Sequence, residues 1–134
     1  MKRNHLSNFA ILLGLSGLLF GSCQSDNSDQ VQLQNQILGK WQIHEAYRNG
    51  KIAESLDDLY FEFFEDGKIR TNLLGANAQF EYTLEDQLIK QKADDNGIEV
   101  DYAITEVSDT ALVLTTLLRR YNFKFDLRKS IEVE

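Results

Sequence analysis

The sequence lacks proline entirely and contains a single cysteine, Cys23, among its 134 residues. Because proline has no backbone N–H to donate to a neighbouring strand, its absence leaves the whole chain able to form β-sheet. One cysteine permits no disulfide within the chain, which excludes the disulfide-stabilised class of small exported domains. Such a chain has to be stabilised by the burial of apolar side chains.

Basic residues are also scarce, with 14 lysines and arginines against 21 acidic residues and a formal net charge of −7. A nucleic-acid site requires clustered lysine and arginine side chains. The nearest candidate here, Arg119-Arg120, is an isolated pair. We therefore expect no nucleic-acid partner.

Residues typical of catalytic and metal sites are sparse as well. Beyond residue 22 the chain has one histidine, His44, and no Gly-x-Ser-x-Gly segment that would present a nucleophilic serine. A zinc site needs several His or Cys ligands. The aspartates fall in separate predicted turns without the spacing of a calcium-binding loop. The sequence therefore predicts no enzyme activity, no cofactor and no metal site.

The first 22 residues have the pattern of an export signal. A short basic start at 1–5 precedes an apolar stretch at 9–20, which is too short and too interrupted to be a spanning helix of ~20 apolar residues. Phe20-Gly21-Ser22-Cys23 then resembles the bacterial lipobox, although leucine is more usual in place of Phe20. We predict cleavage before Cys23 and a diacylglycerol anchor on its thiol. A free exported thiol or an intermolecular disulfide is the alternative.

The residues around Cys23 also indicate where the mature protein works. Gln24 rather than aspartate follows the cysteine. In this the sequence resembles Gram-negative lipoproteins that are sorted to the outer membrane. The predicted organisation is a signal peptide at 1–22, a flexible acidic tether at 23–30 and one domain at 31–134. We expect a cell-envelope lipoprotein that faces either the periplasm or the cell surface.

Short runs of aromatic and β-branched residues alternate with turn-forming pairs such as Asn49-Gly50 and Asp66-Gly67. We predict strands at residues 40–48, 58–65, 68–74, 78–84, 87–92, 97–107, 111–118 and 121–130. The longer connection at 52–57 is expected to be a short helical or irregular lid.

Alternation along these strands assigns one apolar and one polar face, because successive side chains of a strand point to opposite sides of the sheet. Phe61 and Phe63 belong to the apolar face, and so do Tyr121, Phe123 and Phe125 of the last predicted strand. Consecutive hairpins with one apolar face predict a closed up-and-down barrel, which leaves no exposed sheet edge. An open two-layer sandwich is the alternative, but it would usually need longer connections.

A family resemblance begins at Leu38-Gly39-Lys40-Trp41, which follows a predicted short helix at 31–37 and is similar to the Gly-x-Trp segment of lipocalins. The other segments with matching order and spacing are 60–68, 80–84 and 111–114. Together they resemble the bacterial lipocalin-like domains found behind lipoprotein signals. The resemblance implies an all-β fold, an eight-stranded antiparallel barrel with a short N-terminal helix.

The resemblance also implies structural roles for Gly39 and Trp41 at the closed end of the barrel, where in lipocalins an arginine late in the chain lies across the tryptophan. Arg119, Arg120 and Arg128 all lie near the end of this chain, and the sequence does not select one of them. Trp41 is also simply a large core residue, an interpretation that needs no family. Both interpretations predict that Trp41 is buried.

The function that the resemblance implies is non-catalytic binding of a small apolar molecule inside the barrel, since eight-stranded barrels of this kind can hold one. The polar contacts of such a ligand are expected from Thr71, Tyr82, Tyr102 and Thr116. Many aromatic residues compete for the interior, however, so a filled core is an equally strong expectation. A filled barrel would be a surface or periplasmic interaction module, an inhibitor or accessory subunit with a protein partner.

Overall fold

The computed structural model describes residues 24–95 and 97–131, so the predicted signal peptide and Cys23 lie outside the described residues. Its elements are α1 (Gln24–Ile37), β1 (Gly39–Arg48), β2 (Lys51–Ile52), the 3₁₀ helix η1 (Glu54–Leu56), β3 (Tyr60–Phe63), β4 (Lys68–Thr71), β5 (Ala78–Glu85), β6 (Leu88–Gln91), β7 (Val100–Val107), β8 (Ala111–Leu118) and β9 (Tyr121–Lys129). None of the described helices is long and apolar enough to span a membrane.

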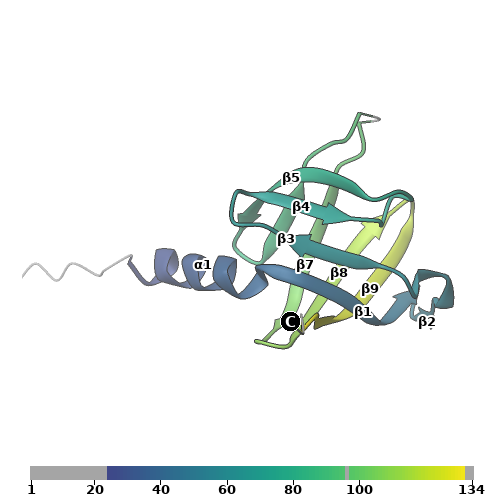
Figure 1. Ribbon diagram of the computed structural model, residues 1–134, viewed down its shortest axis with the longest axis horizontal. Helices are drawn as coiled ribbons and strands as arrows, with labels where there is room; N and C mark the ends of the chain where they lie inside the picture. The colour runs from purple at the N-terminus through teal and green to yellow at the C-terminus, as the bar shows by residue number, and fades with distance from the viewer. Residues whose placement is uncertain (1–23, 96, 132–134) are drawn as a thin grey trace, which may run out of the picture.

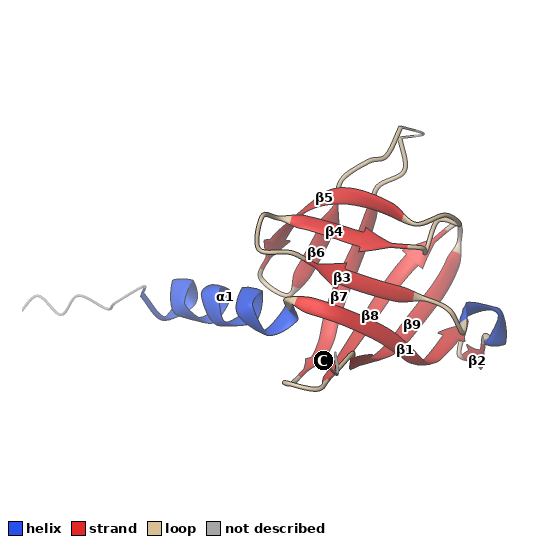
Figure 2. Ribbon diagram, viewed as in Figure 1, coloured by secondary structure: helices blue, strands red, loops and turns tan. Residues whose placement is uncertain are grey.

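The strands form one antiparallel sheet that closes on itself (Figures 1 and 2). From β3 onward each strand pairs with the next one along the chain, and β1 pairs with both β3 and β9. The two-residue strand β2 pairs with the end of β1 and extends the barrel rim. The predicted eight-stranded up-and-down antiparallel barrel with one helix is therefore confirmed.

The helix is longer than the sequence indicated. α1 begins at Gln24 and includes residues 24–30, where a flexible tether was predicted. These residues contain no apolar side chain before Val31, so no helical periodicity distinguishes them from a linker. The end of α1 is fixed to the barrel by Leu33 and Ile37, which are both buried.

β3 and β4 are shorter than the predicted strands 58–65 and 68–74, and the side chain of Asn72 lies where their pairing ends. The amide of Asn72 accepts a hydrogen bond from the backbone N–H of Tyr60 (3.1 Å) and donates one to the carbonyl of Asp58 (2.8 Å). These bonds stop β4 at Thr71, and the chain then turns through 72–77 at the barrel rim.

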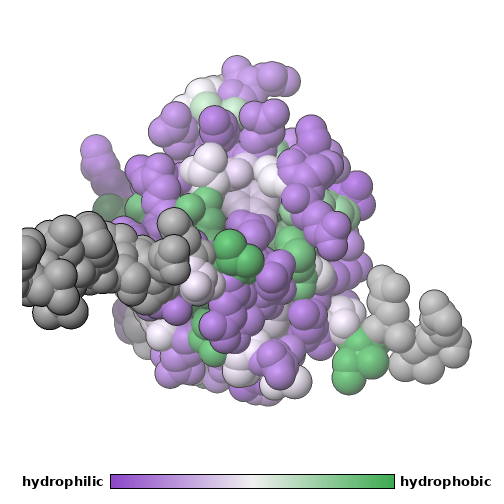
Figure 3. Space-filling model, turned by 90° about the vertical axis from the view of Figure 1, so that its left-hand side faces the viewer, coloured by the Kyte–Doolittle hydropathy of each residue, from purple (hydrophilic) through white to green (hydrophobic). Residues whose placement is uncertain are grey.

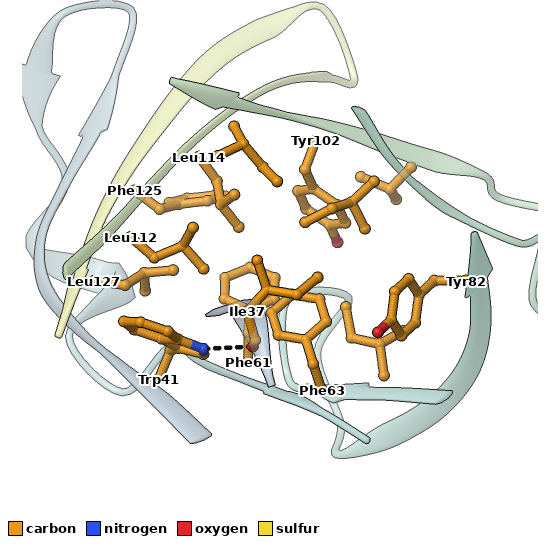
Figure 4. Close-up of a cluster of buried hydrophobic side chains, with 14 of the residues drawn as sticks. Ile37, Trp41, Phe61, Phe63, Tyr82, Tyr102, Leu112, Leu114, Phe125 and Leu127 are labelled. Atoms are coloured by element: carbon orange, nitrogen blue, oxygen red, sulfur yellow. Dashed lines mark hydrogen bonds between the residues drawn. The ribbon is translucent and has the colours of Figure 1, made fainter. Parts of the chain in front are cut away.

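The barrel interior is the hydrophobic core (Figure 4). Its largest fully buried side chains are Trp41, Tyr102, Phe61, Phe63, Phe125, Ile37, Ile69, Ile89, Leu112, Leu114, Leu127 and Gln91. The ring of Phe61 lies 5.3 Å from that of Tyr102 and 5.7 Å from that of Phe125, measured between centroids. Such contacts stabilise a core beyond the area that they bury.

Candidate functional site

The barrel interior is filled by side chains, as the filled-core interpretation expected. Figure 4 shows aromatic and aliphatic side chains from opposite walls pointing toward one another and meeting at the centre. Trp41, Phe61 and Tyr102 have no exposed surface. A site for a small molecule has to be sought at the ends of the barrel or on its outer wall.

The four residues expected to contact a ligand are all buried, but they do not form one site. Thr71 donates a hydrogen bond to the carbonyl of Tyr60 (2.8 Å), and Thr116 donates one to the carbonyl of Asp101 (2.7 Å). Both hydroxyl groups therefore bond to neighbouring strands of their own barrel. They stabilise strand pairing and do not converge on a common cavity.

Tyr82 faces the helix. Its hydroxyl oxygen accepts a hydrogen bond of 2.6 Å from the side-chain amide of Gln34 on α1. Burial raises the pKa of Tyr82, the bond from Gln34 partly opposes that shift, and the charge of Asp66 adds to it. Tyr82 thus connects α1 to β5.

Tyr102 is paired with a residue that the sequence analysis missed. Its hydroxyl donates a hydrogen bond of 2.8 Å to the side-chain oxygen of Gln91, which is 1% exposed. The nitrogen of the same amide has no hydrogen-bond partner among the described residues. Burial raises the pKa of the Tyr102 phenol far above its usual value. Alternation from Ile89 would have placed Gln91 inside, because the two residues lie two positions apart on one strand.

One end of the barrel is closed by α1 and by the residues of the Gly-x-Trp segment. The indole N–H of Trp41 donates a hydrogen bond of 2.8 Å to the carbonyl of Ile37, which is one of the last carbonyls of the helix and has no helical partner. The ammonium of Lys129 lies 5.2 Å from the centroid of the Trp41 ring. A lysine therefore occupies the place that the resemblance gave to an arginine.

Gly39 gives Lys129 room to reach Trp41. Its φ is +111°, and a Cβ built there would lie 3.0 Å from Cε of Lys129. The face of the molecule at this end is mostly hydrophilic, with small separate hydrophobic areas (Figure 3). The α1 end is consequently a closed, packed end of the barrel.

The opposite end has a cavity of about 340 Å³, here called the mouth pocket. Its apolar walls are Leu56, Leu73, Leu74, Leu118 and Phe123. Arg48, Arg119, Tyr121 and Gly75 complete its lining. These residues come from β1, η1, the β4–β5 loop, β8, the β8–β9 turn and β9, so that the pocket lies across the barrel opening.

Phe123 forms part of the boundary between the mouth pocket and the core. Its ring stacks on that of Phe125 at 5.8 Å between centroids, and Phe125 is fully buried. Tyr121 was predicted to point inward but is 45% exposed. It is the first residue of β9 and lies at the rim, where the barrel wall ends. The sequence predicted the short helical segment at 52–57, whose Leu56 lines the mouth pocket, and the inward position of Phe123. It did not predict the pocket itself, because the rest of the wall comes from loops and strand ends that alternation does not place.

A second cavity, here called the outer-wall groove, lies on the outside of the barrel. It has a volume of about 700 Å³, and the residues around it include Tyr47, Leu88, Ala103, Thr115 and Leu117. Leu117 is 67% exposed. Of the four residues expected to contact a ligand, Thr116 borders this groove.

Within the part of the chain that the structure describes, no three His, Cys, Asp or Glu side chains gather in a way that could hold a metal ion. His44 is exposed at the bulge where the register of β1 and β9 shifts. The chemistry available at the mouth pocket is therefore apolar contact, aromatic contact and pairing with arginine.

The comparisons with known proteins agree with this architecture. A lipocalin-like protein from Bacteroides uniformis ATCC 8492 has a solved structure that is similar to this one, with a TM-score of 0.52 and 19% sequence identity over 71% of this chain and 99% of that chain. No protein-family model matches the sequence, and no curated protein sequence matches it. At this identity the similarity is one of fold, so the chain has a lipocalin-like barrel fold.

Proposed function

We propose that the protein is an envelope lipoprotein that binds a small apolar molecule, without catalysis, in the mouth pocket. The observation that supports it is the apolar cavity across the open end of a barrel whose other end is closed. Its volume of about 340 Å³ falls at the small end of the range of about 300–1,000 Å³ typical of ligand pockets. The similarity to a lipocalin-like structure is consistent with this class of function.

Two adjacent residues provide the test of the site. Leu118 lines the mouth pocket, whereas its neighbour Leu117 lines the outer-wall groove. We expect Leu118→Trp to fill the mouth pocket and abolish displacement of the neutral fluorescent probe N-phenylnaphthylamine by decan-1-ol. Leu117→Trp, the matched control, should leave that displacement unchanged. Loss of binding in Leu117→Trp with retention in Leu118→Trp would contradict the assignment.

The proposed anchor is supported by the apolar stretch at 9–20 and the lipobox-like segment that ends at Cys23. Two acyl chains give stable attachment, because each buried methylene contributes about 0.8 kcal/mol. Cys23→Ala should release the protein from the outer-membrane fraction. Undiminished membrane association of that variant would refute the lipoprotein assignment.

The second candidate function is a protein-interaction module at the outer membrane. The filled core and the outer-wall groove with its exposed Leu117 favour it. In that case a partner captured by cross-linking should be lost with Leu117→Asp and retained with Leu118→Trp. Capture that is lost with Leu118→Trp and retained with Leu117→Asp would place the partner at the mouth pocket instead.

A further inference from the structure

We propose that the ligand of the mouth pocket is a single-chain amphiphile with an anionic head group, which Arg48 and Arg119 bind while the leucine walls receive its tail. This inference rests on the proposed function, because it concerns the same pocket. It adds a charge to the ligand and names the two residues that select for it.

The mouth pocket concentrates positive charge on an acidic protein. The residues that line it include two arginines and no acidic residue, although the chain has 21 acidic residues against 14 basic ones. The positive charge at the opening attracts anions to the mouth pocket, although the net negative charge of the whole protein repels them.

Arg48 and Arg119, like Arg120 of the β8–β9 turn, have no acidic partner among the described residues, unlike the two other described arginines. Arg70 pairs with Glu62 at 3.7 Å, and Arg128 pairs with Asp126. Arg48 and Arg119 form no ion pair with any carboxylate of residues 28–95 and 97–131. Their guanidinium groups keep donors for an external anion, and the planar fork of arginine suits a carboxylate or a phosphate.

Tyr121 holds one of the two guanidinium groups at the rim. The guanidinium carbon of Arg48 lies 5.3 Å from the centroid of the Tyr121 ring. Stacking on an aromatic face uses the flat side of the guanidinium and leaves the N–H groups at its edge free.

The turn that presents Arg119 is held in an unfavourable backbone conformation. Arg119 and Arg120 have φ values of 52° and 73°, in the left-handed region that hindered side chains avoid. The Asn49-Gly50 turn has φ values of 50° and 80° and uses the residues that such turns prefer. Strained residues of this kind are concentrated at functional sites, which agrees with a binding role for the β8–β9 turn.

The depth of the pocket limits the tail. Phe123 lies against the buried ring of Phe125, so the closely packed core prevents deep insertion. A cavity of about 340 Å³ suits one short acyl or alkyl chain. The head group, a carboxylate or a phosphate, would remain at the rim beside the arginines.

The test compares three probes with the same tail: decanoate, decyl phosphate and decan-1-ol. Each is titrated against N-phenylnaphthylamine bound to the full-length protein carrying Cys23→Ala, which cannot be lipidated. We expect at least one of the two anions to bind about tenfold more tightly than the alcohol, the effect of one charge-assisted hydrogen bond of about 1.5 kcal/mol. The preference should fall as salt is raised. A stronger response to decanoate or to decyl phosphate identifies the head group.

Arginine variants assign the preference to residues. Arg48→Gln and Arg119→Gln should each lower anion affinity several-fold relative to decan-1-ol affinity measured on the same variant. Arg120→Gln is the matched control, because Arg120 lies in the same turn with a positive φ but does not line the pocket. An equal effect of Arg120→Gln would overturn the assignment to Arg119.

The outcomes separate this inference from the proposed function. Equal affinity for both anions and the alcohol would overturn the anionic head group and leave binding in the mouth pocket standing. Failure of all three probes to displace the dye would overturn both. The comparison of probes on the protein with intact arginines decides the question even where an arginine variant does not fold.

Discussion

Gly39 is constrained both by its backbone conformation and by the side chain of Lys129. An alanine there would adopt a φ of +111° and place its Cβ 3.0 Å from Cε of Lys129. We expect Gly39→Ala to lower the free energy of unfolding by more than the roughly 1–3 kcal/mol that an unfavourable backbone conformation costs. Urea denaturation measures the change.

Gly75→Ala is the matched control for Gly39→Ala. Gly75 has a similar φ of +117°, with nothing within 4 Å of an added Cβ. The extra cost of Gly39→Ala should disappear when it is measured relative to Lys129→Ala, in a double-mutant cycle of the two residues. Equal destabilisation by the two glycine variants would show that Lys129 does not need the space.

Tyr102 should make the stability of the barrel depend on pH in the alkaline range. Burial raises its pKa in the folded protein, while an unfolded tyrosine has a pKa of about 10. Above that pH the unfolded chain loses a proton that the folded chain keeps. The free energy of unfolding should therefore fall as pH rises, by at most about 1.4 kcal/mol per pH unit for this group.

Urea denaturation of the protein and of Tyr102→Phe at several pH values from neutral to alkaline checks this expectation. Tyr102→Phe will lower stability at neutral pH, because it leaves Gln91 without its bond from the phenol. The informative quantity is the slope of the free energy of unfolding against pH in the alkaline range. An unchanged alkaline slope in Tyr102→Phe would assign the pH dependence to other groups, of which Tyr82 is the foremost.

At the scale of elements, α1 is attached to the barrel mainly by its last two turns. Ile37 has no exposed surface, whereas Val31 on the same helix is 62% exposed. We expect Ile37→Ala to lower the free energy of unfolding by about 2–5 kcal/mol, the usual cost of truncating a buried isoleucine. Val31→Ala should change it by less than about 0.5 kcal/mol. Thermal and urea denaturation distinguish the two, and comparable effects would mean that α1 does not seal the barrel.

The turn of the β8–β9 hairpin carries Arg119, the proposed anion-binding residue, in an unfavourable backbone conformation. Replacing Arg119-Arg120 with Asn-Gly would give the turn the residues that its conformation favours. We expect the double variant to raise the free energy of unfolding by about 1 kcal/mol or more and to lower several-fold the preference for the favoured anionic probe over decan-1-ol. A more stable variant with the preference intact would show that Arg119 does not bind the anionic head group.

At the scale of the whole molecule, local patterns predicted the barrel well and its ends poorly. Consecutive hairpins identified the strand order, and alternation identified the buried faces of Phe61, Phe63 and Phe125, because an antiparallel meander is specified by neighbouring segments. The closure of β1 on β9 followed from the need to remove sheet edges. These are consequences of the chain's own periodicity.

The features that the sequence did not predict depend on residues distant in the chain. The mouth pocket brings together Arg48 and Arg119, and the closed end brings Lys129 onto Trp41. No local period relates such residues, because the positions of loops and strand ends follow from the closed barrel. Residues 24–30 were predicted to be a linker because they form a helix without an apolar stripe, so that the local sequence carries no helical pattern.

The length and position of α1 set the orientation of the molecule toward any lipid to which it is tied. Fourteen residues at 1.5 Å each extend about 21 Å, and in Figure 1 the helix projects from the end of the barrel opposite β2 and the mouth. An acylated Cys23, one residue before the helix, would hold the bilayer on the α1 side. The opening would then point into the aqueous space, so a guest molecule would have to come from the water or from another carrier and not by lateral diffusion out of the supporting leaflet.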